Sequence, residues 1–109
     1  MQILIAEINR MRKKLNETIG ELERQGYQKA KTEYIYRVGL AKELLINRDK
    51  GLPVTLNNDV SKGNEVIAKY KFDRDAAESK YDATLEKLRA IKIELGIVER
   101  QIEATRRGE

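Results

Sequence analysis

The sequence predicts an all-helical protein: a long antiparallel helical hairpin, coiled-coil-like, that assembles into a dimeric four-helix bundle. Three observations predict this fold. Charged residues make up 37% of the 109 residues and aromatics only 6%, a balance typical of long solvated helices. One strong break lies near the middle of the chain, and apolar residues on both sides of it recur at helical spacing. The length fits a single domain, 1–109.

The first predicted helix covers about residues 2–49 and carries one apolar stripe. Its members, each three or four residues from the next, are Leu4, Ile8, Met11, Leu15, Ile19, Leu22, Gly26, Ala30, Tyr34, Val38, Ala41 and Leu45. Gly20 and Gly26 each cost about 1 kcal/mol relative to Ala inside a helix, so a kink near Gly26 is the alternative to a straight run. We expect one continuous helix.

The break follows at Asp49-Lys50-Gly51-Leu52-Pro53. Gly51 suits the left-handed position after a helix, and Pro53 cannot continue one. We expect a loop over about 50–58, which carries three apolar side chains at alternating positions. Two interpretations stay open: the loop folds back as a cap over the aromatic residues, or it presents a recognition tip.

The second predicted helix, about 59–107, has a cleaner heptad pattern. Its a positions are Ile67, Arg74, Tyr81, Leu88, Leu95 and Ile102, and its d positions are Tyr70, Ala77, Thr84, Ile91, Val98 and Thr105. Nine of these twelve are apolar or aromatic, which indicates a coiled-coil seam. In a hairpin folded at the break, residues whose numbers add up to about 110 face each other, so that Ile8 meets Ile102.

Apolar residues remain outside this predicted core. The c positions of the second helix, with Ile93 beside them, are Ala76, Ala83, Ala90, Ile97 and Ala104. They form either a second contact face or a surface filled with alanine for its helix propensity. Tyr36 and Phe72 also lie off the seam at one level, as an apolar belt for a partner or as part of the core near the loop. We expect a homodimer or a higher assembly.

The sequence contains few of the residue types that enzymes commonly use for catalysis. The chain contains no His and no Cys, which excludes histidine bases, cysteine nucleophiles, disulfides and the usual zinc sites. The acids between Asp73 and Asp82 are interleaved with Lys and Arg, as in surface ion pairs. No glycine has the spacing of a phosphate-binding loop. We therefore expect a protein that is not an enzyme and uses no cofactor, metal or small-molecule substrate.

The apolar run at the N-terminus is short. Ile3-Leu4-Ile5-Ala6 is interrupted at once by Glu7, which leaves no signal-peptide core and no membrane span. A chain without cysteine also suits a reducing compartment. The sequence therefore predicts a cytoplasmic protein that does not enter a membrane.

The formal net charge of +4 raises nucleic acid as a second kind of partner. The cations that we single out are Lys29, Lys31, Arg37, Lys69 and Lys71, which alternate with aromatics in the middle of the chain, and Arg12, Lys13 and Lys14 near its start. Aromatic platforms between cations are what single strands need for stacking and phosphate neutralisation. Acids among the same cations favour the other interpretation, plain solvated helix faces.

Several blocks of the sequence resemble small helical proteins encoded by phages and prophages of Gram-positive bacteria. The blocks, within a resemblance that spans about 25–105, are Tyr36–Lys42, Gly51–Leu56, Asp59, Lys62-Gly63 and Arg74–Tyr81. The resemblance implies an accessory protein in the host cytoplasm that serves DNA replication or recombination or opposes host defence. We expect self-association and binding of a host or phage protein, with single-stranded nucleic-acid binding as the alternative.

Overall fold

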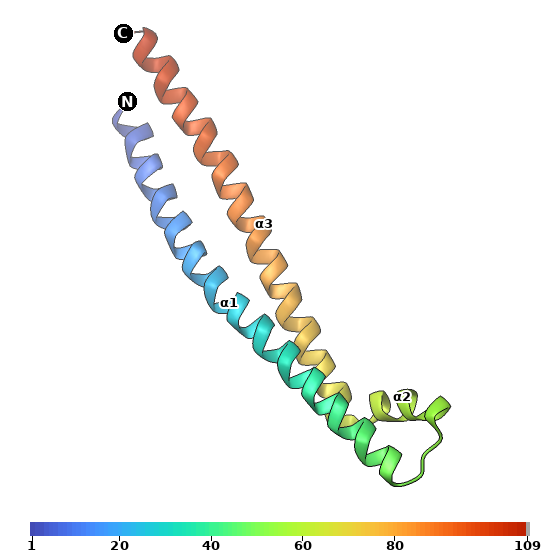
Figure 1. Cartoon of the computed structure of the whole chain (residues 1–109). Helices are drawn as coiled ribbons and strands as arrows, with labels where there is room; N and C mark the ends of the chain where they lie inside the picture. The colour runs from blue at the N-terminus through green and yellow to red at the C-terminus, as the bar shows by residue number, and fades with distance from the viewer. Residues whose placement is uncertain (109) are drawn as a thin grey trace. The chain divides into compact units, whose positions relative to one another are not determined.

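The computed structural model describes residues 1–108, and helices make up nearly all of them (Figure 1). These are α1 (Gln2–Asp49), α2 (Val54–Gly63) and α3 (Glu65–Gly108), with no strand among the described residues. The all-helical prediction is confirmed. Their contacts group them into two compact units, where the sequence predicts one domain: unit 1 holds residues 1–24 with those from Tyr81 on, and unit 2 holds residues 25–80.

The first helix has the predicted bounds and is continuous, so Gly20 and Gly26 do not end it. It ends in a left-handed glycine, because Gly51 has a φ of 88°. The Gly51 N–H donates to the Arg48 carbonyl and the Leu52 N–H to the Asn47 carbonyl, both at 3.0 Å. These two bonds satisfy carbonyls that the helix end leaves unpaired, as in a Schellman motif.

The second half of the chain contains two helices where the sequence predicts a loop and one helix. α2 begins directly after Pro53, whose carbonyl accepts the N–H groups of Leu56 and Asn57 at 3.0 Å. Residues 54–58, expected in the loop, are therefore helical. Asn64 separates α2 from α3, and its side-chain oxygen accepts the Val66 N–H at 2.9 Å, capping the new helix.

Unit 1 pairs the N-terminal part of α1 with the C-terminal part of α3 in antiparallel directions (Figure 1). The Glu21 carboxylate lies 3.5 Å from the Lys87 ammonium, and Ile8 and Ile102 line one hollow. This agrees with the predicted register of the hairpin. The apolar core of this unit consists of Ile8, Met11, Leu88, Ile91 and Ile102, each at most 8% exposed.

Unit 2 pairs the rest of α1 with the start of α3, and α2 also packs against α1. The Glu33 carboxylate lies 3.4 Å from the Arg74 guanidinium, which again places the helices antiparallel. The helices approach closely at Gly39, where an added Cβ would lie 2.9 Å from the Tyr70 ring. The buried apolar residues of this unit are only Tyr36 and Ile67.

The seam of α3 is confirmed, but the seam of α1 differs from the prediction. Eleven of the twelve predicted α3 positions are buried or half-buried, Thr105 being exposed. On α1 the positions that face α3 are Ile8, Met11, Leu15, Thr18, Leu22, Gln25, Lys29, Thr32, Tyr36, Gly39 and Glu43, a strict alternation of steps of three and four. Ile19, Ala30, Tyr34, Ala41 and Leu45 are exposed, so the prediction that they face the second helix is wrong.

The physical reason is that unit 2 accepts polar residues into its seam. A heptad register of alternating three and four steps keeps one face toward the partner helix, whereas the apolar pattern of α1 drifts away from that face after Leu22. On α3, Arg74 lies beside the carboxylate of Glu33, and the Tyr70 ring lies beside Gly39. No helix among residues 1–108 is long and apolar enough to cross a membrane.

Candidate functional site

Two of the acids that were candidates for chemistry, Asp73 and Asp75, take part in ion pairs. Asp73 lies 2.5 Å from Lys69, and Asp75 lies 3.0 Å from Arg74. In the described part of the chain, no group of three or more acidic side chains is placed to hold a metal ion. These carboxylates therefore act as partners of nearby cations on α3.

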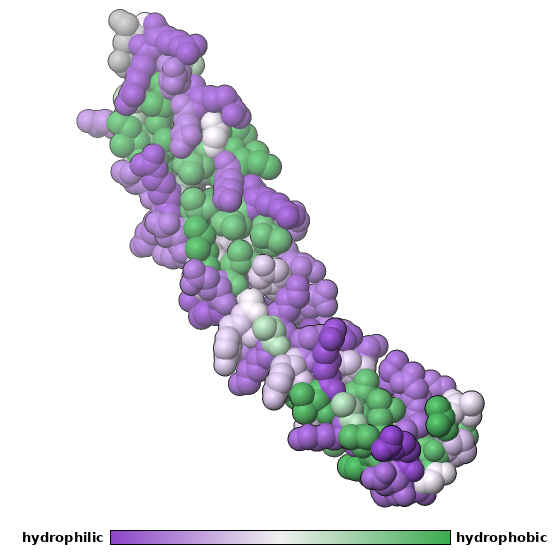
Figure 2. All heavy atoms as spheres, in the orientation of Figure 1, coloured by the Kyte–Doolittle hydropathy of each residue, from purple (hydrophilic) through white to green (hydrophobic). Residues whose placement is uncertain are grey.

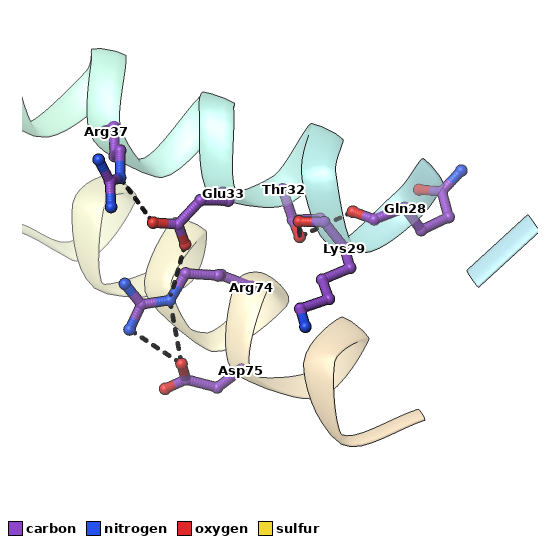
Figure 3. A network of polar contacts seen from close by, with 7 residues as sticks. All are labelled: Gln28, Lys29, Thr32, Glu33, Arg37, Arg74 and Asp75. Atoms are coloured by element: carbon purple, nitrogen blue, oxygen red, sulfur yellow. Dashed lines mark hydrogen bonds and ion pairs between the residues drawn. The ribbon is translucent and has the colours of Figure 1, made fainter. Parts of the chain in front are cut away.

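A polar cluster around Arg74 joins the two helices of unit 2 (Figure 3). Glu33 accepts a hydrogen bond from Arg37 Nε at 2.7 Å and lies 3.4 Å from Arg74 Nε. The hydrogen bond to Asp75, with the nearby charges, holds the pKa of Arg74 above its ordinary value. The guanidinium also lies 4.6 Å from the centre of the Tyr36 ring, a cation–π distance. Arg74 therefore occupies a seam position while its guanidinium contacts Glu33, Asp75 and the Tyr36 ring.

Tyr36 belongs to this cluster and not to a surface for a partner. It is 7% exposed, so the expectation that it lies off the seam beside Phe72 is wrong. The heptad register of α1 places residue 36 in the seam, where the Tyr36 ring packs against the Arg74 guanidinium. Phe72 is 65% exposed and lies on the outer side of α3. The two rings do not form one belt.

The cations of the middle segment are distributed over separate surfaces. Arg37 is bonded to Glu33, and Lys69 to Asp73, with the Lys69 ammonium 5.0 Å from the Phe72 ring. Lys31 and Lys71 are exposed, and Lys29 is half-buried. Tyr27 and Tyr34 lie on the side of α1 opposite its seam, while Phe72 lies on the side of α3 opposite its own. The structure therefore does not bring these aromatics and cations together as one track for a strand.

The basic residues of unit 1 meet at its open end, as the folded hairpin predicts. Arg12 and Arg106 line one hollow, but Glu99 and Glu103 line it too. Lys13 and Lys14 are exposed on α1. Arg107 also lies 3.0 Å from Glu103. This end therefore has mixed charge and is not a purely basic patch.

The predicted contact face of α3 is exposed in unit 1. Ile93 is 65% exposed and Ile97 is 44% exposed. The alanines of the same face that are also exposed are Ala83, Ala90 and Ala104. Ala76 falls in unit 2 and is half-buried. We define the α3 face as the five unit 1 residues.

A second apolar stripe lies on the outside of α1 in unit 2, and the sequence predicts all of its residues except Tyr27 as core. We call it the outer stripe, and its residues are Tyr27, Ala30, Tyr34, Val38, Ala41 and Leu45. Tyr27, Tyr34 and Leu45 are 65%, 68% and 51% exposed. The heptad spacing of these residues is the signal that finds the stripe, but spacing alone does not say which side of the helix is covered.

The short helix α2 turns its polar side inward. Ser61 is fully buried and Asn57 is 9% exposed, while Val54, Leu56 and Val60 are 84%, 53% and 49% exposed. Figure 2 shows hydrophobic side chains at the surface around this end of unit 2 and along the helices of unit 1. The segment does not cover the aromatic residues with its apolar side chains, because α2 is held to α1 by polar groups and leaves Val54, Leu56 and Val60 outside. Whether it presents a recognition tip stays a prediction.

Among the described residues, fifteen large apolar side chains are exposed and only seven apolar residues are buried. Comparison with protein families, with curated proteins and with solved structures finds no match to this chain. The functional interpretation therefore rests on the exposed apolar faces.

Proposed function

We propose that this is a non-enzymatic assembly protein, which associates with itself and binds a protein partner through exposed apolar helix faces. The excess of exposed over buried large apolar residues carries this proposal. The accessible surface of the chain is 8011 Å², whereas a folded monomer of 12.6 kDa exposes about 6200 Å². The excess of about 1800 Å² per chain is more than the roughly 800 Å² that each partner contributes to a standard interface.

The α3 face suits a second copy of the chain. In an antiparallel pair centred near Ile93, Ala90 of one copy lies level with Ile97 of the other, and Ala83 lies level with Ala104. Small residues at these levels allow the two helix backbones to approach closely, and the isoleucines supply the apolar contact. Such a pair is isologous, as most homodimers are.

Charge around the α3 face is also compatible with self-pairing. One residue out of that register, with Ile93 level with Ile93 of the other copy, Glu86 of one copy lies level with Arg100 of the other. That level brings together opposite signs, which favours an antiparallel pair of copies. The dimer would place two helix pairs against each other as a four-helix bundle.

A single-stranded nucleic acid is a less supported partner, because the aromatic and basic residues of unit 2 are divided between two helices, with Lys31 beside Tyr27 and Tyr34 on α1 and Lys69 beside Phe72 on α3. The resemblance to phage-encoded helical proteins supports a partner from the replication, recombination or host-defence proteins of the infected cell. Both assignments are proposals about the binding partner and leave the self-association test unchanged.

Light scattering coupled to size exclusion tests the proposal. We expect the wild type at twice 12.6 kDa and the double variant Ala90→Glu and Ile97→Glu at 12.6 kDa, with unchanged helicity by circular dichroism. The matched control is Ile19→Glu, because Ile19 is 39% exposed on α1 and Ile97 is 44% exposed on α3. A wild type that stays monomeric at all concentrations would refute self-association, and a double variant that stays dimeric would exclude the α3 face.

A further inference from the structure

Between Tyr27 and Leu45 the exposed charges beside the outer stripe of α1 are basic, and exposed acids, Glu23 and Asp49, lie beyond its two ends. The exposed cations beside it include Lys31, Lys42 and Arg48, none of which makes an ion pair within residues 1–108. The two acids between Tyr27 and Arg48 are Glu33 and Glu43, and both are half-buried toward the seam. Glu33 is further occupied by Arg37 and Arg74. The outside of this segment is therefore apolar along its middle and basic along its edges.

The apolar part has the form that a single helix covers. Bulky Tyr27, Tyr34 and Leu45 alternate with small Ala30 and Ala41 at heptad spacing, so that side chains of a facing helix can enter between them. The stripe spans about 27 Å along α1, or five helical turns. A surface of this kind binds the apolar side chains of a partner helix that are spaced three, four and seven residues apart.

We propose that the outer stripe binds an acidic amphipathic helix of a partner protein. This inference rests on the proposed function and names the chemistry and the place of the partner. Glu and Asp beside the apolar side of such a helix pair with the unpaired Lys31 and Lys42. A second copy of the chain is the poorer occupant of this stripe, because its Lys31 and Lys42 would bring more positive charge to the same rim.

A single strand of nucleic acid also fits this stripe less well than a helix does. Tyr27 and Tyr34 are two helical turns apart, about 10.5 Å, so they do not stack consecutive bases. Beyond Tyr34 the stripe continues with Val38, Ala41 and Leu45, which offer no aromatic ring. A protein helix can therefore pack against the aliphatic half of the stripe, whereas the bases of a nucleic-acid strand have no aromatic ring to stack on there.

Calorimetric titration of the full chain with defined probes tests this inference. The first probe is a designed 21-residue helical peptide, with Leu and Ala at its heptad core positions and Glu beside them. The other peptides carry Lys in place of every Glu, or Ser in place of every Leu. We expect a Kd of about 1–50 μM for the first peptide, which weakens with salt, and affinities at least about ten-fold lower for the other two. The fourth probe is a fifteen-residue oligothymidylate, for which we expect no comparable affinity.

Two surface variants of matched exposure locate the site. Tyr34→Glu places a charge on the stripe and is expected to weaken the acidic peptide at least about ten-fold. Phe72→Glu is its control, because Phe72 is 65% exposed on α3 and Tyr34 is 68% exposed on α1, and its affinity should stay within about two-fold. The pair Lys31→Glu and Lys42→Glu should also weaken binding, while the exposed Lys80→Glu should not. Helicity of every variant is checked by circular dichroism.

The remaining outcomes either overturn the inference or separate it from self-association. Absence of peptide binding up to about 200 μM refutes it, and so does equal weakening by Phe72→Glu. Oligothymidylate binding that Tyr34→Glu abolishes, without peptide binding, assigns the stripe to nucleic acid instead. If the wild type is a dimer but does not bind the acidic peptide, this inference is refuted and self-association is kept. A monomer that binds the peptide refutes self-association and keeps the outer stripe as a partner site.

Discussion

Ser61→Ala tests the polar contact that holds α2 against α1. Ser61 Oγ accepts a hydrogen bond from Asn47 Nδ2 and donates one to Asn57 Oδ1, both at 2.9 Å. Asn57 Nδ2 in turn donates to the Leu44 carbonyl at 2.9 Å. Because Ser61 is fully buried and Asn57 is 9% exposed, water does not readily replace a lost bond. The substitution removes the central atom of this network and keeps the size of the side chain nearly constant.

The expected cost follows from these contacts. Two hydrogen bonds contribute about 1 kcal/mol each, and the buried Asn57 oxygen that loses its donor adds about 1 kcal/mol. Alanine returns about 0.5 kcal/mol through its higher helix propensity. The net loss is therefore about 2.5 kcal/mol, a large share of the stability of so small a unit. It corresponds to about 70-fold weaker protection of the amides of α2.

Hydrogen exchange of the backbone amides in α2, together with urea unfolding, measures this loss. The matched control is Ser79→Ala, because Ser79 is exposed on α3 and should gain only the propensity term. Protection of α2 that changes less than about three-fold in Ser61→Ala would refute the reasoning, since the buried network would then contribute almost nothing. Equal losses in both variants would refute it as well.

Two further predictions concern a close contact and a surface carboxylate. Gly39→Ala should lower the free energy of unfolding by about 1 kcal/mol or more, because the added Cβ would lie 2.9 Å from the Tyr70 ring, whereas Gly20→Ala should raise it by up to about 1 kcal/mol in the same urea titrations. The hydrogen bond from Arg10 holds the pKa of Glu7 below its ordinary value. Its stabilising contribution is therefore present above the ordinary pKa and is lost as the pH falls through the lowered one, so Glu7→Gln should flatten the acid limb of stability against pH.

Much of the helical framework could be predicted from local signals. The bounds of α1 follow from its continuous helical periodicity and from Gly51, whose left-handed backbone ends the helix. The seam of α3 follows from heptads whose apolar residues coincide with the buried side. Exposure of the α3 face follows in the same way, because Ile93 and Ile97 lie away from that seam.

The inner side of α1 in unit 2 could not be predicted, because two stripes compete for it. The outer stripe is the more apolar, yet the buried one contains Lys29, Thr32 and Tyr36. Hydrophobic periodicity finds only the outer stripe, because it does not include the partner groups that make a polar seam acceptable. Arg74 supplies those groups here, since it pairs with Glu33 and covers Tyr36.

The sequence by itself thus determined that the chain is helical, where α1 stops and which side of α3 is apolar, because these depend on backbone propensity and on spacing along one helix. Tertiary structure alone decided that α2 is a separate helix with a buried Ser61, and that Tyr34 faces outward while Tyr36 faces α3. Those outcomes depend on hydrogen bonds and close contacts between residues far apart in the chain, such as Asn47 with Ser61. Periodicity along a single helix carries no record of such contacts.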